Sequence, residues 1–153
     1  MKRILVSLLV AGLLCSGSAM AQTKDVSTWT EASELTLTGK LFPDTPNPYH
    51  RLDTMRFKGF TKKENLQVRE SSGIAVAFRT DSPYIKVKTE YGTIEYPMNT
   101  NGIAAKGYDL YIKQGGKWLF AAAAAKGNGN EAQELALINN MDFSMHECLL
   151  YLP

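Results

Sequence analysis

The sequence His146-Glu147-Cys148 brings together three side-chain types that bind metal ions. Neighbouring residues on a strand point to opposite faces, so at most His146 and Cys148 could share one ion. A zinc site needs about four ligands, and no second pair stands at a recognisable spacing. We therefore predict no metal site and no cofactor, and we expect Cys148 to be a small buried apolar residue.

Acyl transfer would require a serine nucleophile after a strand, a histidine base held by an acid, and oxyanion donors. Asp81-Ser82 offers a serine, but no glycine precedes it, Pro83 follows it, and it lies between two strand-like segments. The chain contains no Gly-x-Ser-x-Gly elbow and no Asp-x-x-His pair. We predict that Ser82 lies in a turn, that the chain has no catalytic residue, and that it is not an enzyme by itself.

A polar cluster of His50, Arg51 and Asp53 follows a stiff loop that contains Pro43, Pro46 and Pro48. One interpretation is a solvated loop end with a local contact between arginine and carboxylate, which contributes little stability. The other is that Arg51 orders a domain boundary or docks on a neighbouring domain. Farther along the chain, Asp109 at a strand start is typical of a carboxylate that caps a turn or binds backbone.

Aromatic residues are frequent enough to suggest a sugar-stacking platform, with Tyr91, Tyr96, Tyr108, Tyr111 and Trp118 as its candidates. Aromatic side chains in a sandwich more often belong to the core. We therefore expect Trp118 and Phe120 to pack beside Tyr108, Leu110 and Ile112. A coplanar, exposed aromatic pair would instead favour carbohydrate binding.

Many short segments alternate apolar and polar residues with a period of two, which is typical of half-buried antiparallel strands. Gly115-Gly116 predicts a hairpin between two of them, and Asn101-Gly102 predicts another turn. Residues 121–126 and 131–138 are also read as strands, although alanine favours helix in the first. One all-β, antiparallel sandwich domain follows from this pattern. The alternating sets are Leu35, Leu37 and Leu41; Ile74, Val76 and Phe78; Ile85, Val87, Thr89 and Tyr91; and Tyr108, Leu110 and Ile112.

Gly107-Tyr108-Asp109-Leu110-Tyr111 precedes Gly115-Gly116-Lys117-Trp118, and the chain closes on Glu147-Cys148-Leu149-Leu150-Tyr151-Leu152-Pro153. With Pro48-Tyr49-His50-Arg51-Leu52-Asp53, these stretches resemble the GxDLY-motif domain that precedes the catalytic domain in bacterial SGNH/GDSL-type esterases. The resemblance implies a jelly-roll-like fold and a hydrolase domain in cis as partner. The motif residues that it implies are structural are Gly107, Asp109, Leu110, Tyr111 and Trp118; the candidate interface residues are His50, Arg51, Asp53 and Tyr151.

Residues 1–21 have the pattern of an export signal: Lys2 and Arg3, an apolar run too short to span ~30 Å of hydrocarbon, and the small-residue site Ala19-Met20-Ala21. Cleavage would remove Lys2 and Arg3 from the 17 basic residues, which leaves 15 basic and 15 acidic residues. A neutral domain without a basic stripe predicts no nucleic-acid partner. Only Cys148 would remain, so the predicted mature chain, residues 22–153, has no internal disulfide. The predicted location is periplasmic or extracellular, without stable membrane insertion.

The leading hypothesis is a non-catalytic accessory domain that shapes access to a hydrolase acting on acylated carbohydrate, as the resemblance implies. The alternative is a free-standing, secreted carbohydrate-binding sandwich with a glycan as partner. In the family the hydrolase follows the Leu-Tyr-Leu-Pro sequence, so we expect this chain to be truncated at its C-terminal end and to lack the catalytic domain. Both faces of the last strand turn apolar toward Pro153, which predicts an open edge or bare face and self-association of residues 22–153.

Overall fold

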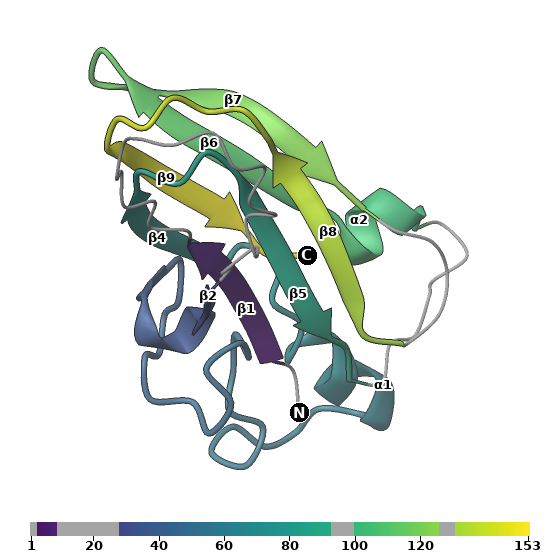
Figure 1. The fold of residues 1–153 in the computed structure, drawn as a ribbon. Helices are drawn as coiled ribbons and strands as arrows, with labels where there is room; N and C mark the ends of the chain where they lie inside the picture. The colour runs from purple at the N-terminus through teal and green to yellow at the C-terminus, as the bar shows by residue number, and fades with distance from the viewer. Residues whose placement is uncertain (1–2, 9–27, 93–99, 126–130) are drawn as a thin grey trace, which may run out of the picture.

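The computed structural model describes residues 3–8, 28–92, 100–125 and 131–153, and within these ranges it consists mainly of antiparallel strands (Figure 1). Sheet A has the order β2-β1-β5-β8, and sheet B has the order β3-β4-β9-β6-β7. The predicted all-β class is therefore confirmed. The strands of sheet A are β1 (Arg3–Leu8), β2 (Thr28–Glu31), β5 (Ile85–Glu90) and β8 (Gln133–Ile138). Those of sheet B are β3 (Thr36–Thr38), β4 (Ala75–Thr80), β6 (Tyr108–Gln114), β7 (Lys117–Ala124) and β9 (His146–Tyr151).

Strand β1 lies inside the predicted export signal and pairs antiparallel with both β2 and β5. Cleavage after Ala21 would remove it and leave one edge of β2 and one edge of β5 without this partner. Most of the predicted signal, including the cleavage site, lies outside the described residues, so the signal stays a prediction. In the part of the chain that the structure describes, no helix is both long and apolar enough to cross a bilayer.

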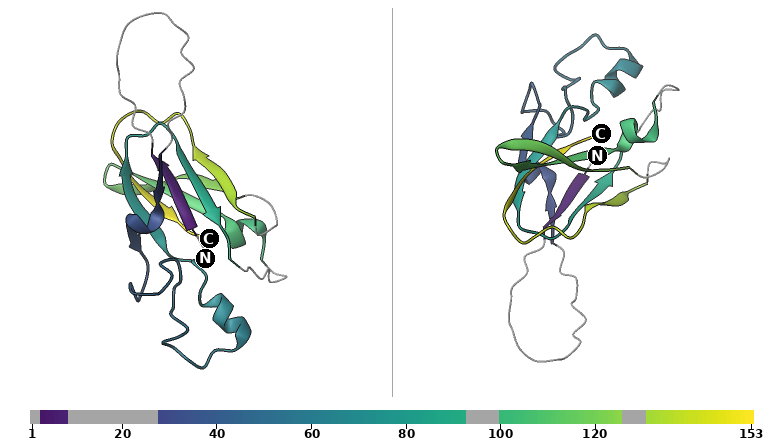
Figure 2. Two further views of the ribbon diagram at one scale, coloured as in Figure 1. Left: turned by 60° about the horizontal axis from the view of Figure 1, so that its bottom comes forward. Right: turned by 90° about the horizontal axis from the view of Figure 1, so that it is seen from above.

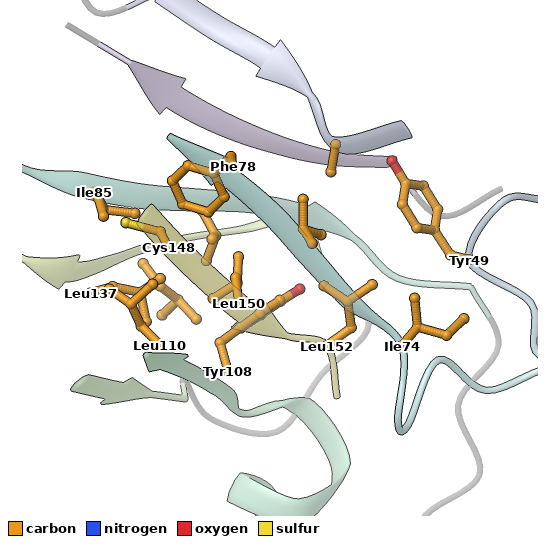
Figure 3. Close-up of a cluster of buried hydrophobic side chains, with 14 residues drawn as sticks. Tyr49, Ile74, Phe78, Ile85, Tyr108, Leu110, Leu137, Cys148, Leu150 and Leu152 are labelled. Carbon is orange, nitrogen blue, oxygen red and sulfur yellow. The ribbon is translucent and has the colours of Figure 1, made fainter. Parts of the chain in front are cut away.

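The core lies between the two sheets and is built by the inward half of each alternating strand (Figure 3). Val76 of β4, Leu110 of β6 and Leu150 of β9 are fully buried, and Val87 of β5 is fully buried in the same core cluster. Burying one such side chain contributes about 1.5–3 kcal/mol. Period-two alternation thus located most of the core. Leu41 is the exception, because β3 ends at Thr38 and Leu41 is 82% exposed.

Strand β9 is a central strand, which differs from the predicted open edge. It pairs with β4 on one side and with β6 on the other, so its backbone is hydrogen-bonded along both edges. Its inner residues Cys148 and Leu150 are buried, and Leu152, just beyond the strand, continues the same side. On the opposite side of the strand, Tyr151 is 40% exposed and Leu149 is partly buried, and self-association through this side stays a prediction.

Within the described ranges, three short helices that the strand pattern did not predict join strands. Helices η1 (Ala32–Glu34) and α2 (Gly102–Lys106) lie between strands of different sheets, whereas α1 (Lys62–Gln67) lies between β3 and β4 of sheet B. The segment that carries α1 extends beyond one end of the sheets (Figure 2). A capping box fixes the start of α1, since Thr61 Oγ1 accepts from the Glu64 amide and Glu64 accepts from the Thr61 amide. Asn101, expected in a turn, instead caps α2 by accepting from the Ala104 amide.

Gly115-Gly116 forms the predicted two-residue hairpin turn between β6 and β7, with φ of 55° and 78°. This turn sets the register, so that Gln114 lies opposite Lys117 and Lys113 opposite Trp118. A bulge then shifts the register between Leu110 and Tyr111. Of the two segments predicted as strands, residues 121–124 belong to β7 and residues 133–138 to β8, while Lys126 lies outside the described residues.

Candidate functional site

The motif stretch begins with a glycine at a position where a side chain would collide with the backbone of the preceding helix. Gly107 follows directly after α2, and its amide donates to the Ile103 carbonyl at 2.7 Å. A Cβ atom on Gly107 would stand 2.3 Å from the same carbonyl oxygen. The glycine therefore allows β6 to start against the end of the helix.

Tyr108 and Leu110 belong to the core, since both side chains are fully buried. The Tyr108 hydroxyl hydrogen-bonds with the Thr89 hydroxyl across the core, and burial raises the pKa of Tyr108 above its ordinary value. Tyr91 is also buried, and its ring lies 4.6 Å from the ammonium of buried Lys106. Tyr91 and Tyr108 therefore cannot belong to a surface platform, and Tyr96 lies outside the described residues.

Asp109 and Tyr111 point the other way, onto the outer surface of sheet B. Asp109 is exposed, and no group of the described chain hydrogen-bonds or ion-pairs with its carboxylate, so the expected turn cap is not seen. The Tyr111 ring contacts Phe120 and Tyr151 edge-on, with centroid distances of 5.8 and 5.7 Å and interplanar angles of 75° and 74°. Neither contact is the coplanar pair expected of a sugar-stacking platform.

Trp118 and Phe120 lie on this outer surface and not in the core, which corrects the prediction. The two-residue turn places Trp118 opposite Lys113 and Phe120 opposite Tyr111, and both partners face outward. Trp118 is 43% and Phe120 60% exposed. We call Tyr111, Trp118, Phe120 and Tyr151 together the outer aromatic face.

Two hollows flank Pro153, where the described chain ends. The larger, of about 510 Å³, is lined by the predicted interface residues His50 and Asp53, with Arg69 and Glu70 beside them. The smaller, of about 340 Å³, is lined by Asp109, Tyr111 and Tyr151. Pro153 borders both. The structure thus brings three of the four predicted interface residues to one end of the domain.

Arg51, the fourth predicted interface residue, is engaged within the domain. Its Nε donates to the Glu70 carbonyl at 2.9 Å and its Nη2 to the Gln67 carbonyl at 2.6 Å, so it ties the proline-containing loop to the end of α1. The expected local pairing with a carboxylate is not what the structure shows. Asp53 instead accepts from the Met55 amide at 2.8 Å, which closes a tight turn.

Tyr49 is the anchor of this loop, which the sequence did not single out. Its ring is buried, and its hydroxyl donates to the Glu31 carboxylate and accepts from the Ser33 amide at 3.0 Å. Burial raises the pKa of Tyr49. The hollow that contains His50 therefore borders a loop that is fixed at its centre by a buried side chain.

The last two residues are held firmly. The Leu152 amide donates to the Ile74 carbonyl at 2.9 Å, and the Ser71 hydroxyl donates to the Pro153 carbonyl at 2.6 Å. Leu152 and Pro153 are both buried. The backbone thus reaches position 153 as part of the packed domain.

Ser82 lies in the connection between β4 and β5, where it is buried. Its hydroxyl donates to the Tyr84 carbonyl at 2.7 Å, and its amide donates to Thr80 Oγ1 at 3.0 Å. A Ser–His–Asp cluster that the sequence analysis missed lies elsewhere, at Asp142, Ser144 and His146. The alternation Asp-x-Ser-x-His before a strand could have signalled it.

This cluster does not have the geometry of a catalytic triad. Asp142 Oδ1 lies 2.8 Å and Ser144 Oγ 3.2 Å from His146 Nε2, so acid and hydroxyl contact the same ring nitrogen. A general base needs the acid on one nitrogen and the nucleophile on the other. The Ser144 hydroxyl and amide donate to Asp142 instead, which holds the pKa of that carboxyl at about 2.

Cys148 is buried on the inner face of sheet B, and desolvation raises the pKa of its thiol to about 12. His146 precedes it on the same strand, but across residues 3–8, 28–92, 100–125 and 131–153 no three His, Cys, Asp or Glu side chains gather into a metal-binding group.

The comparisons with known proteins agree with this arrangement. The family model of the GxDLY domain, the N-terminus of SGNH hydrolase-type esterases, matches residues 27–153. The crystal structure of a protein from Bacteroides ovatus ATCC 8483, classed as a GDSL-like lipase, superposes with a TM-score of 0.72 at 38% sequence identity. The match covers 80% of this chain but only 35% of that one. No curated protein matches. This chain therefore belongs to the GxDLY family, the domain that forms the N-terminus of SGNH-type esterases.

Proposed function

We propose that this domain is the non-catalytic N-terminal accessory domain of an exported SGNH-type esterase that acts on acylated carbohydrate. It packs on the hydrolase domain and shapes access to it. The observation that carries the proposal is the match of residues 27–153 to the domain that forms the N-terminus of SGNH hydrolase-type esterases.

The anchoring of Leu152 and Pro153 supports a fixed orientation between the two domains. The Ser71 hydroxyl and the Ile74 carbonyl hold this end of the backbone. A chain that continues from here starts at a defined point and direction. Domains joined by loose linkers move relative to one another by default, whereas a short rigid connection restricts that motion.

The hollows beside Pro153 support a role in substrate access. The larger one presents His50, Asp53, Arg69 and Glu70, which can hydrogen-bond to sugar hydroxyls. A hydrolase that begins at Pro153 would lie next to this polar surface. Substrate that approaches the hydrolase along this end would then pass over it.

The test compares three proteins: a two-domain enzyme carrying this chain, its hydrolase domain alone, and the enzyme with a flexible Gly/Ser insertion directly after Pro153. Deletion and insertion should each lower kcat/KM for an acetylated oligosaccharide at least about tenfold, equivalent to about 1.4 kcal/mol. Activity on 4-nitrophenyl acetate, which is too small to contact this domain, serves as the control and should not change. Equal kcat/KM of the three proteins on the oligosaccharide would refute the proposal.

Two further measurements test the other parts of the proposal, which are that this domain is non-catalytic and that it is exported. Residues 22–153 alone should show no turnover of 4-nitrophenyl acetate; activity above a heat-inactivated sample that Ser82→Ala or Ser144→Ala abolishes would show that the chain is itself a hydrolase.

Export with removal of residues 1–21 predicts that N-terminal sequencing of the secreted protein starts at Gln22. A secreted protein that retains Met1 would rule out this cleavage.

A further inference from the structure

The outer surface of sheet B carries more apolar area than a solvated sheet face normally does. An antiparallel sheet with one face in water usually has polar residues on that face. Here Phe120 is 60%, Trp118 43% and Tyr151 40% exposed, on the three neighbouring strands β6, β7 and β9 together with Tyr111. Contiguous exposed apolar surface of this kind marks interaction sites.

The outer aromatic face has the anatomy of a protein interface. Aromatic side chains occupy its centre, where Tyr111 touches both Phe120 and Tyr151. Charged groups stand at its border: Lys113 Nζ lies 2.8 Å from Glu147 Oε2 and 5.7 Å from the Trp118 ring centroid. An apolar, aromatic centre with a polar rim is typical of protein–protein contacts.

The ring geometry favours a protein surface over a sugar. Stacking on a pyranose requires a flat, exposed ring plane, whereas the Tyr111 ring meets its two neighbours at 75° and 74°. Edge-to-face rings interlock and present an uneven apolar surface. Such a surface fits the side chains of a folded domain.

The position of Pro153 indicates which partner covers the outer aromatic face. Tyr151 belongs to the face, and the chain passes two residues later through Pro153, which borders the smaller hollow with Asp109 and Tyr111. In the Bacteroides ovatus protein, the larger part of the chain lies outside the match to this domain. We propose that the outer aromatic face is the surface on which the hydrolase domain docks, with Asp109 receiving a cation or hydrogen-bond donor from it. This proposal rests on the proposed function and assigns its contact surface.

Hydroxyl-radical footprinting read by mass spectrometry tests the docking surface. The chain is compared, free and joined through Pro153 to an SGNH hydrolase domain. In the joined protein, oxidation of Phe120, Trp118 and Tyr151 should be lost. Leu41 and Phe143, which are 82% and 69% exposed and do not belong to the outer aromatic face, should be oxidised equally in both.

Matched variants separate docking from folding. The double variant Phe120→Ser with Tyr151→Ser changes outward side chains, so the thermal midpoint of the free chain should stay close to that of the Phe143→Ser control. In the joined protein, only the double variant should restore oxidation of Trp118. A fall in the free chain's midpoint together with unchanged protection of Trp118 would overturn the proposal.

The remaining outcomes also decide the question. If Met55 at the larger hollow is protected while the outer aromatic face stays fully reactive, the domain packs on its hydrolase through a different surface. That result would overturn the outer aromatic face as the docking surface but not the proposed function. If both Met55 and the outer aromatic face stay fully reactive in the joined protein, the proposal that this domain packs on the hydrolase is overturned as well. Protection that appears in the free chain as its concentration rises would assign the face to a second copy, and protection by acetylated xylohexaose would assign it to a saccharide; each overturns the hydrolase as occupant.

Discussion

Replacing Gly107 by alanine should destabilise the domain although the backbone angles of Gly107 are ordinary for alanine. Gly107 has φ of −79° and ψ of 153°, so no left-handed strain is involved. The added Cβ would stand 2.3 Å from the Ile103 carbonyl oxygen and 3.1 Å from Ile103 Cγ2. Comfortable contacts lie at about 3.5 Å, so β6 and the end of α2 must separate by about 1 Å.

The magnitude follows from three contributions. Forcing extra volume into a packed site costs about 1–3 kcal/mol. Separating the two segments also weakens the 2.7 Å bond from the Gly107 amide to Ile103, which contributes about 1 kcal/mol. The lower entropy of alanine in the unfolded chain offsets about 0.4–1 kcal/mol. The net loss of unfolding free energy should be about 1–4 kcal/mol.

Gly102→Ala is the matched control, because Gly102 begins α2 and a Cβ there meets nothing within 4 Å. This substitution should leave stability unchanged or raise it by up to about 1 kcal/mol, since alanine favours helix. Urea unfolding followed by far-UV circular dichroism measures both variants. Equal midpoints for Gly107→Ala and Gly102→Ala would refute the idea that close packing against Ile103 requires the motif's glycine.

Three further predictions concern side chains on opposite faces of sheet B and at its border. Leu150→Ala should cost about 2–5 kcal/mol of unfolding free energy, whereas Trp118→Ala should cost clearly less because Trp118 is 43% exposed; thermal melts that rank them the other way would contradict this placement. The Asp142 pKa of about 2 lies below its ordinary 3.8, so its contribution to stability is present above pH ~4 and is lost as pH falls toward 2; an NMR titration should show that Ser144→Ala raises this pKa. The Cys148 thiol, with its pKa raised to about 12, should not react with DTNB at pH 8 until urea unfolds the chain.

The strands were predictable because burial of one sheet face imposes a period of two on the sequence. Ile74, Val76 and Phe78 alternate with Ala75 and Ala77, and all three larger side chains are buried. Strand order was not predictable in this way. Nothing in residues 146–152 shows that β9 pairs with both β4 and β6, because pairing partners are chosen by contacts between distant segments.

The misplacement of Trp118 and Phe120 came from register and not from hydrophobicity. A two-residue turn at Gly115-Gly116 pairs Lys113 with Trp118, so both aromatic residues had to share the face of Lys113 and Tyr111. Counting outward from the turn would have placed them correctly. The bulge beyond Phe120 could not have been read in the same way, because the alanine run has no alternation to reveal a shift.

The candidate site could be predicted only in part, because its residues are brought together by tertiary structure. His50 and Asp53 could be singled out as polar residues after a proline-containing loop, but their proximity to Pro153 depends on the packed fold. The helix that receives Arg51 carried a readable signal, since Thr61 and Glu64 have the spacing of a capping box. Which carbonyls Arg51 would bind could not be inferred, because its partners Gln67 and Glu70 are brought to it by tertiary structure.

The family motif takes on two roles because it occupies a strand. Once Gly107 fixes where β6 begins, alternation directs Tyr108 and Leu110 into the core and leaves Asp109 and Tyr111 on the outer surface. The inward pair is explained by burial and by the bond between Tyr108 and Thr89. No equivalent account within this domain exists for Asp109, whose carboxylate is exposed and has no bonding partner among the described residues. A motif whose inward half secures the fold and whose outward half borders the end of the domain is what a surface that holds a second domain would require.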